Sequence, residues 1–249
     1  MKVTILGTGS PEGHPIILHP DDYVEGDESR LRPGLLIEDN DIVLFDINPD
    51  IRLQLLKLRI KSLNAIFVTH QHFDHLWGIG DLFQLTWLGK INFTIYTNND
   101  TKNYINKYFP WINLNFEIFE YDKTYVFRNF TVTPKKAMHS IKFDTAVFET
   151  KIGSKNILYA PDFKGFMDEK YVKDYDFAVI DGAYYFGKYI EDDDHLGGKD
   201  LEKLINKTSA KINYLIGVSP YWYRQLSSEL LTKLPTNILL PKDFEQIKI

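Results

Sequence analysis

The chain has 249 residues, of which 44% are hydrophobic and 25% are charged, and its formal net charge at pH 7 is −5. This composition is ordinary for a globular protein with a substantial core, and the acidic balance excludes a global basic field that would hold nucleic acid. No apolar run approaches the ~20 residues of a membrane span. The chain has no cysteine, which excludes disulfides and thiolate metal sites, so a metal would need His, Asp, Glu, Tyr or backbone oxygen as ligands.

The first apolar run, residues 2–6, predicts a β-strand and is too short to be the core of a signal peptide. We therefore expect a cytoplasmic protein. The loop that follows, residues 7–13, contains Gly-x-Gly. Its spacing to Gly13 does not match the dinucleotide-binding pattern, and no helical periodicity follows it. Residues 14–34 contain several prolines and predict a long loop.

From there the chain alternates short apolar runs with amphipathic segments and turns. Residues 35–38 and 42–45 bracket a turn and predict a β-hairpin. Further strands are expected at residues 65–68, 93–96, 115–119, 125–127, 130–135, 145–151, 156–159, 177–180 and 213–217. Helices are expected at residues 49–59, 81–88, 100–108, 199–206 and 225–234. This grouping predicts an α/β protein with two sheets packed face to face and helices outside.

One heptapeptide, Thr69–His75, concentrates residues that bind metal. The apolar run just before it would deliver it to a sheet edge, where side chains point into a cleft. His70 and His72 are two apart and lie on the same side of an extended chain, whereas Asp74 and His75 fall where the chain turns into a helix. Three imidazoles and a carboxylate suit Zn²⁺, Mn²⁺ or Fe²⁺. The alternative is an exposed polar loop that is rich in histidine.

The heptapeptide resembles the His-x-His-x-Asp-His signature of the metallo-β-lactamase superfamily, which fixes four positions of scarce residue types. The resemblance implies one αββα domain over residues 1–249, in which two mixed β-sheets are flanked by helices. The order of the other motifs is similar too: Asp46 ends a strand before the signature, and His139 and Asp162 each follow a later strand. Taken alone, a single His or Asp after a strand is more often structural.

The resemblance assigns roles to these residues and implies one or two divalent ions, with zinc first and manganese or iron as alternatives. The implied ligands are His70, His72 and His139 for a first ion, Asp74 and His75 for a second, and Asp162 as the bridge. Asp46 would orient the metal loop rather than bind metal, since a metal-bound His commonly donates its other N–H to such a partner.

The implied chemistry is hydrolysis. Two ions ~3.5–4 Å apart lower the pKa of a shared water toward neutrality, which gives hydroxide as the nucleophile. Asp74 would orient this hydroxide or accept its proton. In ribonuclease Z and in the cyclic phosphodiesterases of phosphonate breakdown, a similar His before a helix donates a proton to the leaving oxygen, and His195 occupies the matching place. The acidic residues 192–194 would favour its imidazolium form if they lie close. Otherwise His195 is an ordinary histidine at a helix entry.

The chain departs from these families after its last expected strand. There the families continue into Thr-His, whose His completes the second metal site, whereas residues 217–220 of this chain are Gly-Val-Ser-Pro and no His follows His195. The second site would then hold its ion weakly, use water, Tyr221 or Tyr223 instead, or stay empty.

The function implied by the resemblance is cleavage of a small or cyclic phosphodiester through metal-bound hydroxide. Substrate contacts are expected from Gly9 and Ser10 in the glycine-rich loop and from Arg30 and Arg32, because arginine binds phosphate bidentately. A solvated basic pair is the alternative for the two arginines.

Two rival interpretations remain: hydrolysis of a lactone, ester or thioester at the same metals, or an accessory or binding protein with an incomplete second site. The acidic chain lacks the arm with which ribonuclease Z grips tRNA, which argues against a nucleic-acid partner and favours a small-molecule substrate. Relatives of the pyrroloquinoline-quinone biosynthesis protein B type share the fold. Dimers are common among such relatives, so a homodimer stays open.

Overall fold

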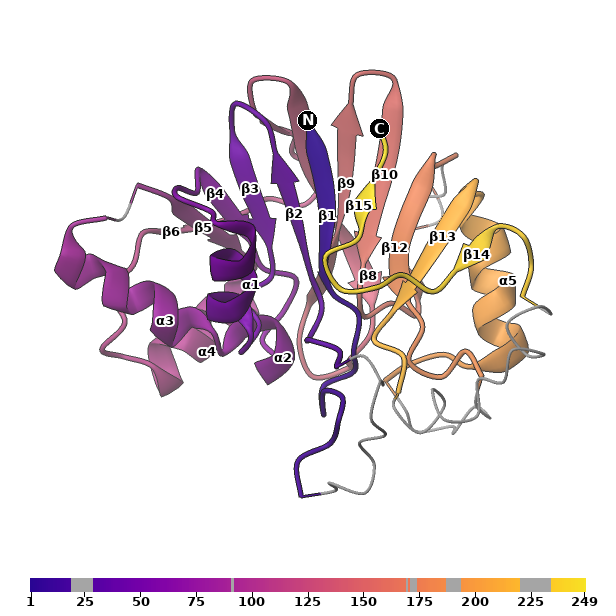
Figure 1. Cartoon of the computed structure of the whole chain (residues 1–249), viewed down its shortest axis with the longest axis horizontal. Coiled ribbons are helices and arrows are strands. Elements are labelled where there is room, and N and C mark those ends of the chain that lie inside the picture. Colours follow the sequence, from indigo (N-terminus) through magenta and orange to yellow (C-terminus); the bar gives the residue numbers. More distant parts are fainter. Residues whose placement is uncertain (19–28, 91, 169, 171–173, 187–193, 220–233) are drawn as a thin grey trace.

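The computed structural model describes residues 1–18, 29–90, 92–168, 170, 174–186, 194–219 and 234–249. In this part of the chain, the strands form two mixed β-sheets that pack face to face, and helices cover their outer faces (Figure 1). The αββα sandwich expected from the sequence is therefore confirmed.

The first sheet has the strand order β15–β1–β2–β3–β4–β5–β6. Its strands are β1 (Lys2–Gly7), β2 (Gly34–Glu38), β3 (Ile42–Phe45), β4 (Ala65–Phe67), β5 (Thr94–Thr97), β6 (Phe116–Ile118) and β15 (Gln246–Ile247). The predicted hairpin is confirmed as β2–β3, in which Leu36 lies opposite Leu44. From β3 to β6 neighbouring strands run parallel, so their carboxyl ends meet at one edge of the sheet.

The second sheet has the order β11–β8–β9–β10–β12–β13–β14, and β7 pairs with β8. Its strands are β7 (Tyr125–Val126), β8 (Phe130–Met138), β9 (Thr145–Ile152), β10 (Lys155–Ala160), β11 (Gly165–Phe166), β12 (Phe177–Asp181), β13 (Ile212–Ile216) and β14 (Ile238–Leu239). The β8–β9–β10 part is antiparallel, and β10, β12, β13 and β14 run parallel. Strands β8, β10 and β12 therefore end at the same edge.

The helices are α1 (Ile51–Leu58), α2 (Phe73–Leu76), α3 (Ile79–Gln84), the 3₁₀ helix η2 (Leu85–Leu88), α4 (Asn99–Tyr108) and α5 (Gly198–Thr208). Helices α1, α3 and α4 lie beside the first sheet, and α5 lies beside the second (Figure 1). The helix expected over residues 81–88 is corrected: it begins earlier, at Ile79, and tightens into η2 at Leu85. The helix expected at 225–234 falls almost wholly outside the described residues. None of the described helices is long and apolar enough to span a membrane.

Aliphatic and aromatic side chains together fill the space between the two sheets. The ring of Phe45, on β3, lies 5.4 Å from that of Phe148 on β9 and 5.6 Å from that of Tyr159 on β10, measured between centroids. Such contacts bury large apolar surfaces and hold the sheets at a fixed separation. They also bring the ends of β3 and β4 close to the ends of β8 and β10.

Candidate metal centre

The metal-binding residues expected from the sequence gather at one edge of the sandwich, which is the lower edge in Figure 1. Asp46 follows β3, and the heptapeptide follows β4. From the second sheet, His139 follows β8, Asp162 follows β10 and Asp181 is the last residue of β12. The site is thus assembled from the ends of strands that belong to both sheets.

Four side chains converge closely enough to share one ion: each of His70, His72, His139 and Asp162 offers a ligand atom, and these atoms lie within 4.8 Å of one another. His70 Nε2 lies 2.9 Å from His72 Nδ1 and 3.2 Å from Asp162 Oδ2. His139 Nε2 lies 3.2 Å from His72 Nδ1 and also 3.2 Å from Asp162 Oδ2. Zinc ligands about 2.0–2.1 Å from a tetrahedral ion are about 3.3 Å apart. The spacing and the chemistry of this donor set therefore fit one divalent ion.

A second group of donors shares the Asp162 carboxylate. His75 Nε2 lies 3.2 Å from Asp74 Oδ2 and 3.4 Å from Asp162 Oδ2. This nitrogen is buried and has no hydrogen-bond partner among the described residues. A buried polar atom without a partner is costly, and a cation between the nitrogen and the two carboxylates would satisfy it. The three donors fit a second ion with fewer protein ligands than the first.

No histidine follows His195 in the sequence, so the segment after β13 brings none to this second group. After β13 the backbone continues through Gly217 and Val218, and Val218 pairs with Gly9 in an isolated parallel bridge. The substitutes considered from the sequence, Tyr221 and Tyr223, lie outside the described residues.

Asp46 lies behind the metal-binding side chains, as expected for a residue that orients them. It is fully buried, and its Oδ2 lies 2.8 Å from His75 Nδ1 and accepts a hydrogen bond from the Tyr159 hydroxyl at 2.9 Å. Its Oδ1 accepts the backbone N–H and the hydroxyl of Thr69 at 2.8 and 2.9 Å. One carboxylate therefore fixes both the start of the metal loop and the His75 ring.

Two other rings of the candidate centre, those of His70 and His139, are anchored through their second nitrogen too. His70 Nδ1 lies 3.0 Å from the Thr69 hydroxyl, and His139 Nδ1 lies 2.9 Å from the backbone carbonyl oxygen of Asp194. Burial holds the pKa of His70 well below its usual value and lowers the pKa of His139. Metal ligation requires neutral imidazole, so burial prepares both rings for it.

His195 is held by Asp181, a residue that the sequence analysis did not single out. His195 Nδ1 lies 2.7 Å from Asp181 Oδ2. Burial alone would lower the pKa of His195, but the Asp181 carboxylate outweighs it and raises this pKa to about 10. The signal that could have identified Asp181 is its place at a strand end, which it shares with Asp46 and Asp162.

The sequence suggested that the acidic run before His195 would favour its imidazolium form if those residues lie close, and Asp194 is the one residue of the run that the structure describes. Asp194 contributes its backbone carbonyl to His139, whereas Asp181 contributes the carboxylate to His195. Residues 192 and 193 lie outside the described residues.

An aromatic rim borders the exposed side of the centre, where the His72 side chain is 37% exposed. The Phe143 ring stacks on His70 at 5.7 Å between centroids and meets the edge of His72 at 4.9 Å. Phe73, between two of the metal-binding residues, lies 6.1 Å from Trp77, and both rings are exposed. Substrates would therefore approach past apolar surface.

The residues expected to contact substrate have other partners in the structure. Arg30 Nη1 donates to the Thr8 hydroxyl at 2.8 Å and to the Pro241 carbonyl at 2.9 Å. Arg32 forms an ion pair with Asp50 at 3.2 Å. Through these bonds both arginines stabilise the long loop. The interpretation of a solvated basic pair is therefore wrong. A phosphate contact by either arginine stays a prediction.

In the glycine-rich loop, Gly9 lies against the segment after β13 through its bridge to Val218. A side chain at Gly9 would meet the Arg30 carbonyl oxygen at 2.9 Å, so only glycine fits this close approach. Ser10 is buried, and its hydroxyl has no hydrogen-bond partner among the described residues. A substrate contact by Gly9 or Ser10 also stays a prediction.

Comparisons with known proteins agree with this geometry. A family model described as "Beta-lactamase superfamily domain" matches residues 42–217. Among curated proteins, a ribonuclease Z of Listeria monocytogenes is 27% identical over 175 residues, which are 62% of this chain and 57% of that protein. An octanoyltransferase of Porphyromonas gingivalis is 37% identical over 92 residues, which are 35% of this chain and 19% of that protein. The chain thus spans about half of one relative and about a fifth of the other.

Two solved structures share the fold over nearly their whole length. A diphosphatase from the PhnP family has a TM-score of 0.81 at 23% identity, with 100% of this chain and 97% of that chain covered. Zinc-bound PqqB from Methylobacterium extorquens has a TM-score of 0.81 at 15% identity, with 100% of both chains covered.

Proposed function

This chain belongs to the β-lactamase superfamily, and we propose that it is a metal-dependent hydrolase that cleaves a small or cyclic phosphodiester. The observation that carries the proposal is the placement of the His195–Asp181 pair beside the His70, His72, His139 and Asp162 donor set, with the rings of His139 and His195 5.1 Å apart. In this proposal residues 1–249 act as one domain on a small-molecule substrate.

The two donor groups would hold divalent ions, with zinc first and manganese or iron as alternatives. His70, His72, His139 and Asp162 would hold one ion, and His75 and Asp74, together with the shared Asp162 carboxylate, would hold a second. Such ions acidify water and neutralise charge on a phosphoryl oxygen.

The protein's own groups supply proton transfer. Asp74 is 3% exposed, and its carboxylate would accept the proton of the attacking water. His195 would donate a proton to the leaving oxygen through Nε2, because Nδ1 is engaged by Asp181. Asp181 is itself fixed by the backbone N–H of Ala183 at 2.9 Å and of Phe163 at 3.2 Å, so the acid is held in one orientation.

A proton donor matters most when the leaving group is a poor one, such as an alkoxide from a phosphodiester. This favours phosphodiesters over activated thioesters, whose leaving thiolate needs no acid. The names of a ribonuclease Z and of a diphosphatase among the similar proteins also refer to phosphate bonds.

A second candidate is hydrolysis of an ester or thioester at the same site. The segment shared with an octanoyltransferase favours it, because that protein's name refers to acyl transfer. A third candidate is an accessory protein that binds a ligand without turning it over, which the reduced donor set of the second ion favours.

The test compares phosphodiester and acyl substrates on one preparation. Protein loaded with zinc or manganese is assayed with bis(p-nitrophenyl) phosphate, a cyclic nucleotide, p-nitrophenyl octanoate, an octanoyl thioester and a lactone. We expect kcat/KM to be highest for a phosphodiester, to fall by more than about 100-fold in His139→Ala, and to be unchanged in the control Lys151→Ala. A preference for the acyl substrates would replace this proposal with the second candidate. No turnover of any substrate by metal-loaded protein would replace it with the third.

A further inference from the structure

A cavity with a volume of about 630 Å³ lies in the helical layer over the first sheet, between the end of α1 and the α3–η2 segment. We propose that it binds a monomeric amphiphilic anion, with an aliphatic chain in the cavity and a carboxylate head at its mouth. This inference goes beyond the proposed hydrolase function and does not depend on it.

The cavity is at the opposite end of the strands from the metal centre. Leu63 and Phe93 line it and come just before β4 and β5, which run parallel. The metal-binding heptapeptide follows β4 at its other end. The cavity is therefore a separate site rather than an extension of the cleft at the metals.

Apolar side chains make up most of the lining of the cavity, and Ser62 and Asn92 are its polar uncharged members. Leu63, Leu82 and Phe93 form its floor and are 8%, 3% and 5% exposed, so the cavity reaches down to the core beneath the helices. Leu55 and Leu85 are half-buried and form parts of its walls. Volumes of about 300–1,000 Å³ with mostly apolar linings are typical of small-molecule sites. An aliphatic chain placed here would be removed from water against side chains of the same kind.

The charge at the mouth of the cavity is positive. Lys61 and Lys90 line it and are exposed, and no acidic side chain is among the described residues that line it. Neither lysine forms an ion pair with a described residue, although the chain as a whole carries a net charge of −5. Two ammonium groups above an apolar cavity match an anionic head on an aliphatic chain.

The experiment titrates the metal-loaded protein with decanoate, octanoate, hexanoate and acetate while methyl NMR signals of leucine are followed. We expect decanoate to shift the methyl signals of Leu63, Leu82 and Leu85. We also expect the affinity to fall about fourfold for each methylene removed. Acetate has the same head without the chain, so it reports carboxylate binding that does not depend on the apolar cavity.

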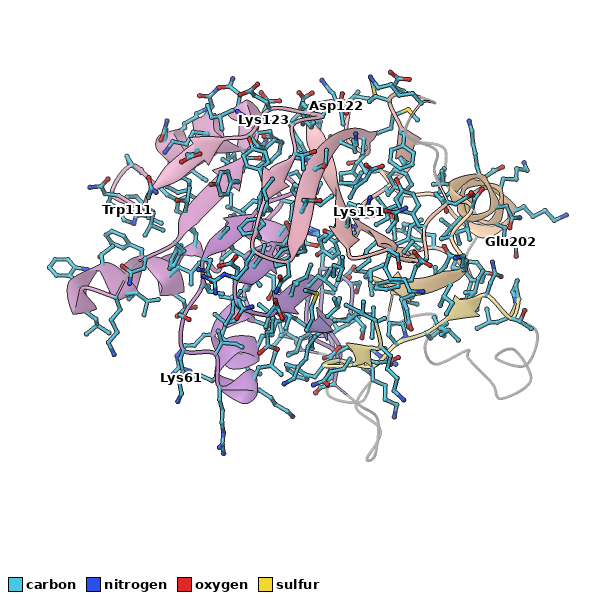
Figure 2. The ribbon with its side chains drawn as sticks, turned by 90° about the horizontal axis from the view of Figure 1, so that it is seen from above. Lys61, Trp111, Asp122, Lys123, Lys151 and Glu202 are labelled. Carbon is cyan, nitrogen blue, oxygen red and sulfur yellow. The ribbon has the colours of Figure 1, made fainter. Side chains whose placement is uncertain are left out.

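Substitutions test how much the carboxylate head contributes to binding, separately from the aliphatic chain of the ligand. The double variant Lys61→Glu/Lys90→Glu should weaken decanoate binding by more than about tenfold, because it replaces two attractive charges with repulsive ones. Lys151→Glu is the matched control, since Lys151 lies on β9 of the other sheet, and Figure 2 shows it well apart from Lys61. Unchanged melting temperatures would show that the variants are folded.

Three results would overturn the proposal. The first is an absence of shifts at the three leucines up to the solubility limit of decanoate. The second is an affinity that does not depend on chain length or on the two lysines. The third is binding only to phosphatidylglycerol vesicles with none to monomeric decanoate, which would assign this surface to a membrane instead.

Discussion

His195 Nδ1 and Asp181 Oδ2 are 2.7 Å apart, although the two residues come from different segments, the end of β12 and the approach to α5. The Asp181 carboxylate is 1% exposed and is held by two backbone N–H groups. A His with one nitrogen fixed in this way presents its other nitrogen in a defined direction.

Asp181→Asn should therefore lower kcat by about 10- to 100-fold on phosphodiesters with alkoxide leaving groups. The loss should be much smaller with a p-nitrophenolate leaving group, which departs without a proton. Rates with a series of leaving groups measure this difference. Asp194→Ala is the control, because Asp194 acts through its backbone carbonyl, and its rates should stay near those of the unmodified protein. Equal losses across the leaving-group series would contradict a role in positioning the acid.

Asp46→Asn should weaken metal binding by about 10- to 100-fold, because it removes the carboxylate that fixes His75 and Thr69. The measurement is competition for the metal with a chromophoric chelator. Tyr159→Phe is the milder partner variant, since it removes one hydrogen bond to the same carboxylate and should cost about 1 kcal/mol of stability. If Asp46→Asn bound metal as tightly as the unmodified protein, the orienting role of Asp46 would be wrong.

Metal stoichiometry should show two ions of unequal affinity. The four-donor group around His139 should retain its ion through dialysis, and the group around His75 should lose its ion first, because it has fewer protein ligands. Elemental mass spectrometry of untagged protein measures the retained equivalents. His139→Ala should abolish the tightly held equivalent, and His75→Ala should affect only the weaker one. Two equally tight equivalents would require a further ligand for the second ion.

Asp176 should contribute to stability in a pH-dependent way. It accepts hydrogen bonds from Lys211 Nζ and from the backbone N–H of Asn156, both at 2.9 Å, and these hold its pKa at about 2. A carboxyl whose pKa is lowered by folding stabilises the protein above its unfolded pKa of about 3.9, and this contribution disappears as the pH falls toward its folded pKa.

Asp176→Asn should thus lower the free energy of unfolding by about 1 kcal/mol at neutral pH, and the difference should vanish near its folded pKa. Urea unfolding of metal-free protein at several pH values measures it without interference from the metal ligands. Asp200→Asn is the control, because the Asp200–Lys203 pair is exposed and should contribute little. A deficit that persists unchanged into acid would point to lost packing rather than lost charge.

The sequence singled out most of the side chains that converge at the candidate metal centre because their signal is local. His70, His72, Asp74 and His75 are fixed by spacing within one loop, and a strand end marks Asp46, so little tertiary information was needed. Helices and longer strands were also predicted, since periodicity records which face is buried.

The residues that were missed depend on contacts between distant segments. Asp181 meets His195 where the segment after β12 pairs with the entry to α5 through the Tyr184–Gly197 bridge, which no spacing in the chain records. Chain adjacency pointed to Asp194, whose observed contact is instead a backbone carbonyl that meets His139. Strands as short as β14 and β15 have too few residues to show a periodic hydrophobic pattern. They form because β13 and β1, which are longer strands, offer them a free edge for pairing.

The donors of the first ion come from both halves of the sandwich, with His70 and His72 delivered by one sheet and His139 and Asp162 by the other. An ion bound there would link the two sheets, next to the Tyr159–Asp46 hydrogen bond, which also joins them. Removal of the ion by a chelator would then loosen the contact between the two sheets as well as abolish the chemistry that the ion supplies. Amide hydrogen exchange along the facing ends of β4 and β10 would rise in metal-free protein, while the far ends of the same strands would stay protected.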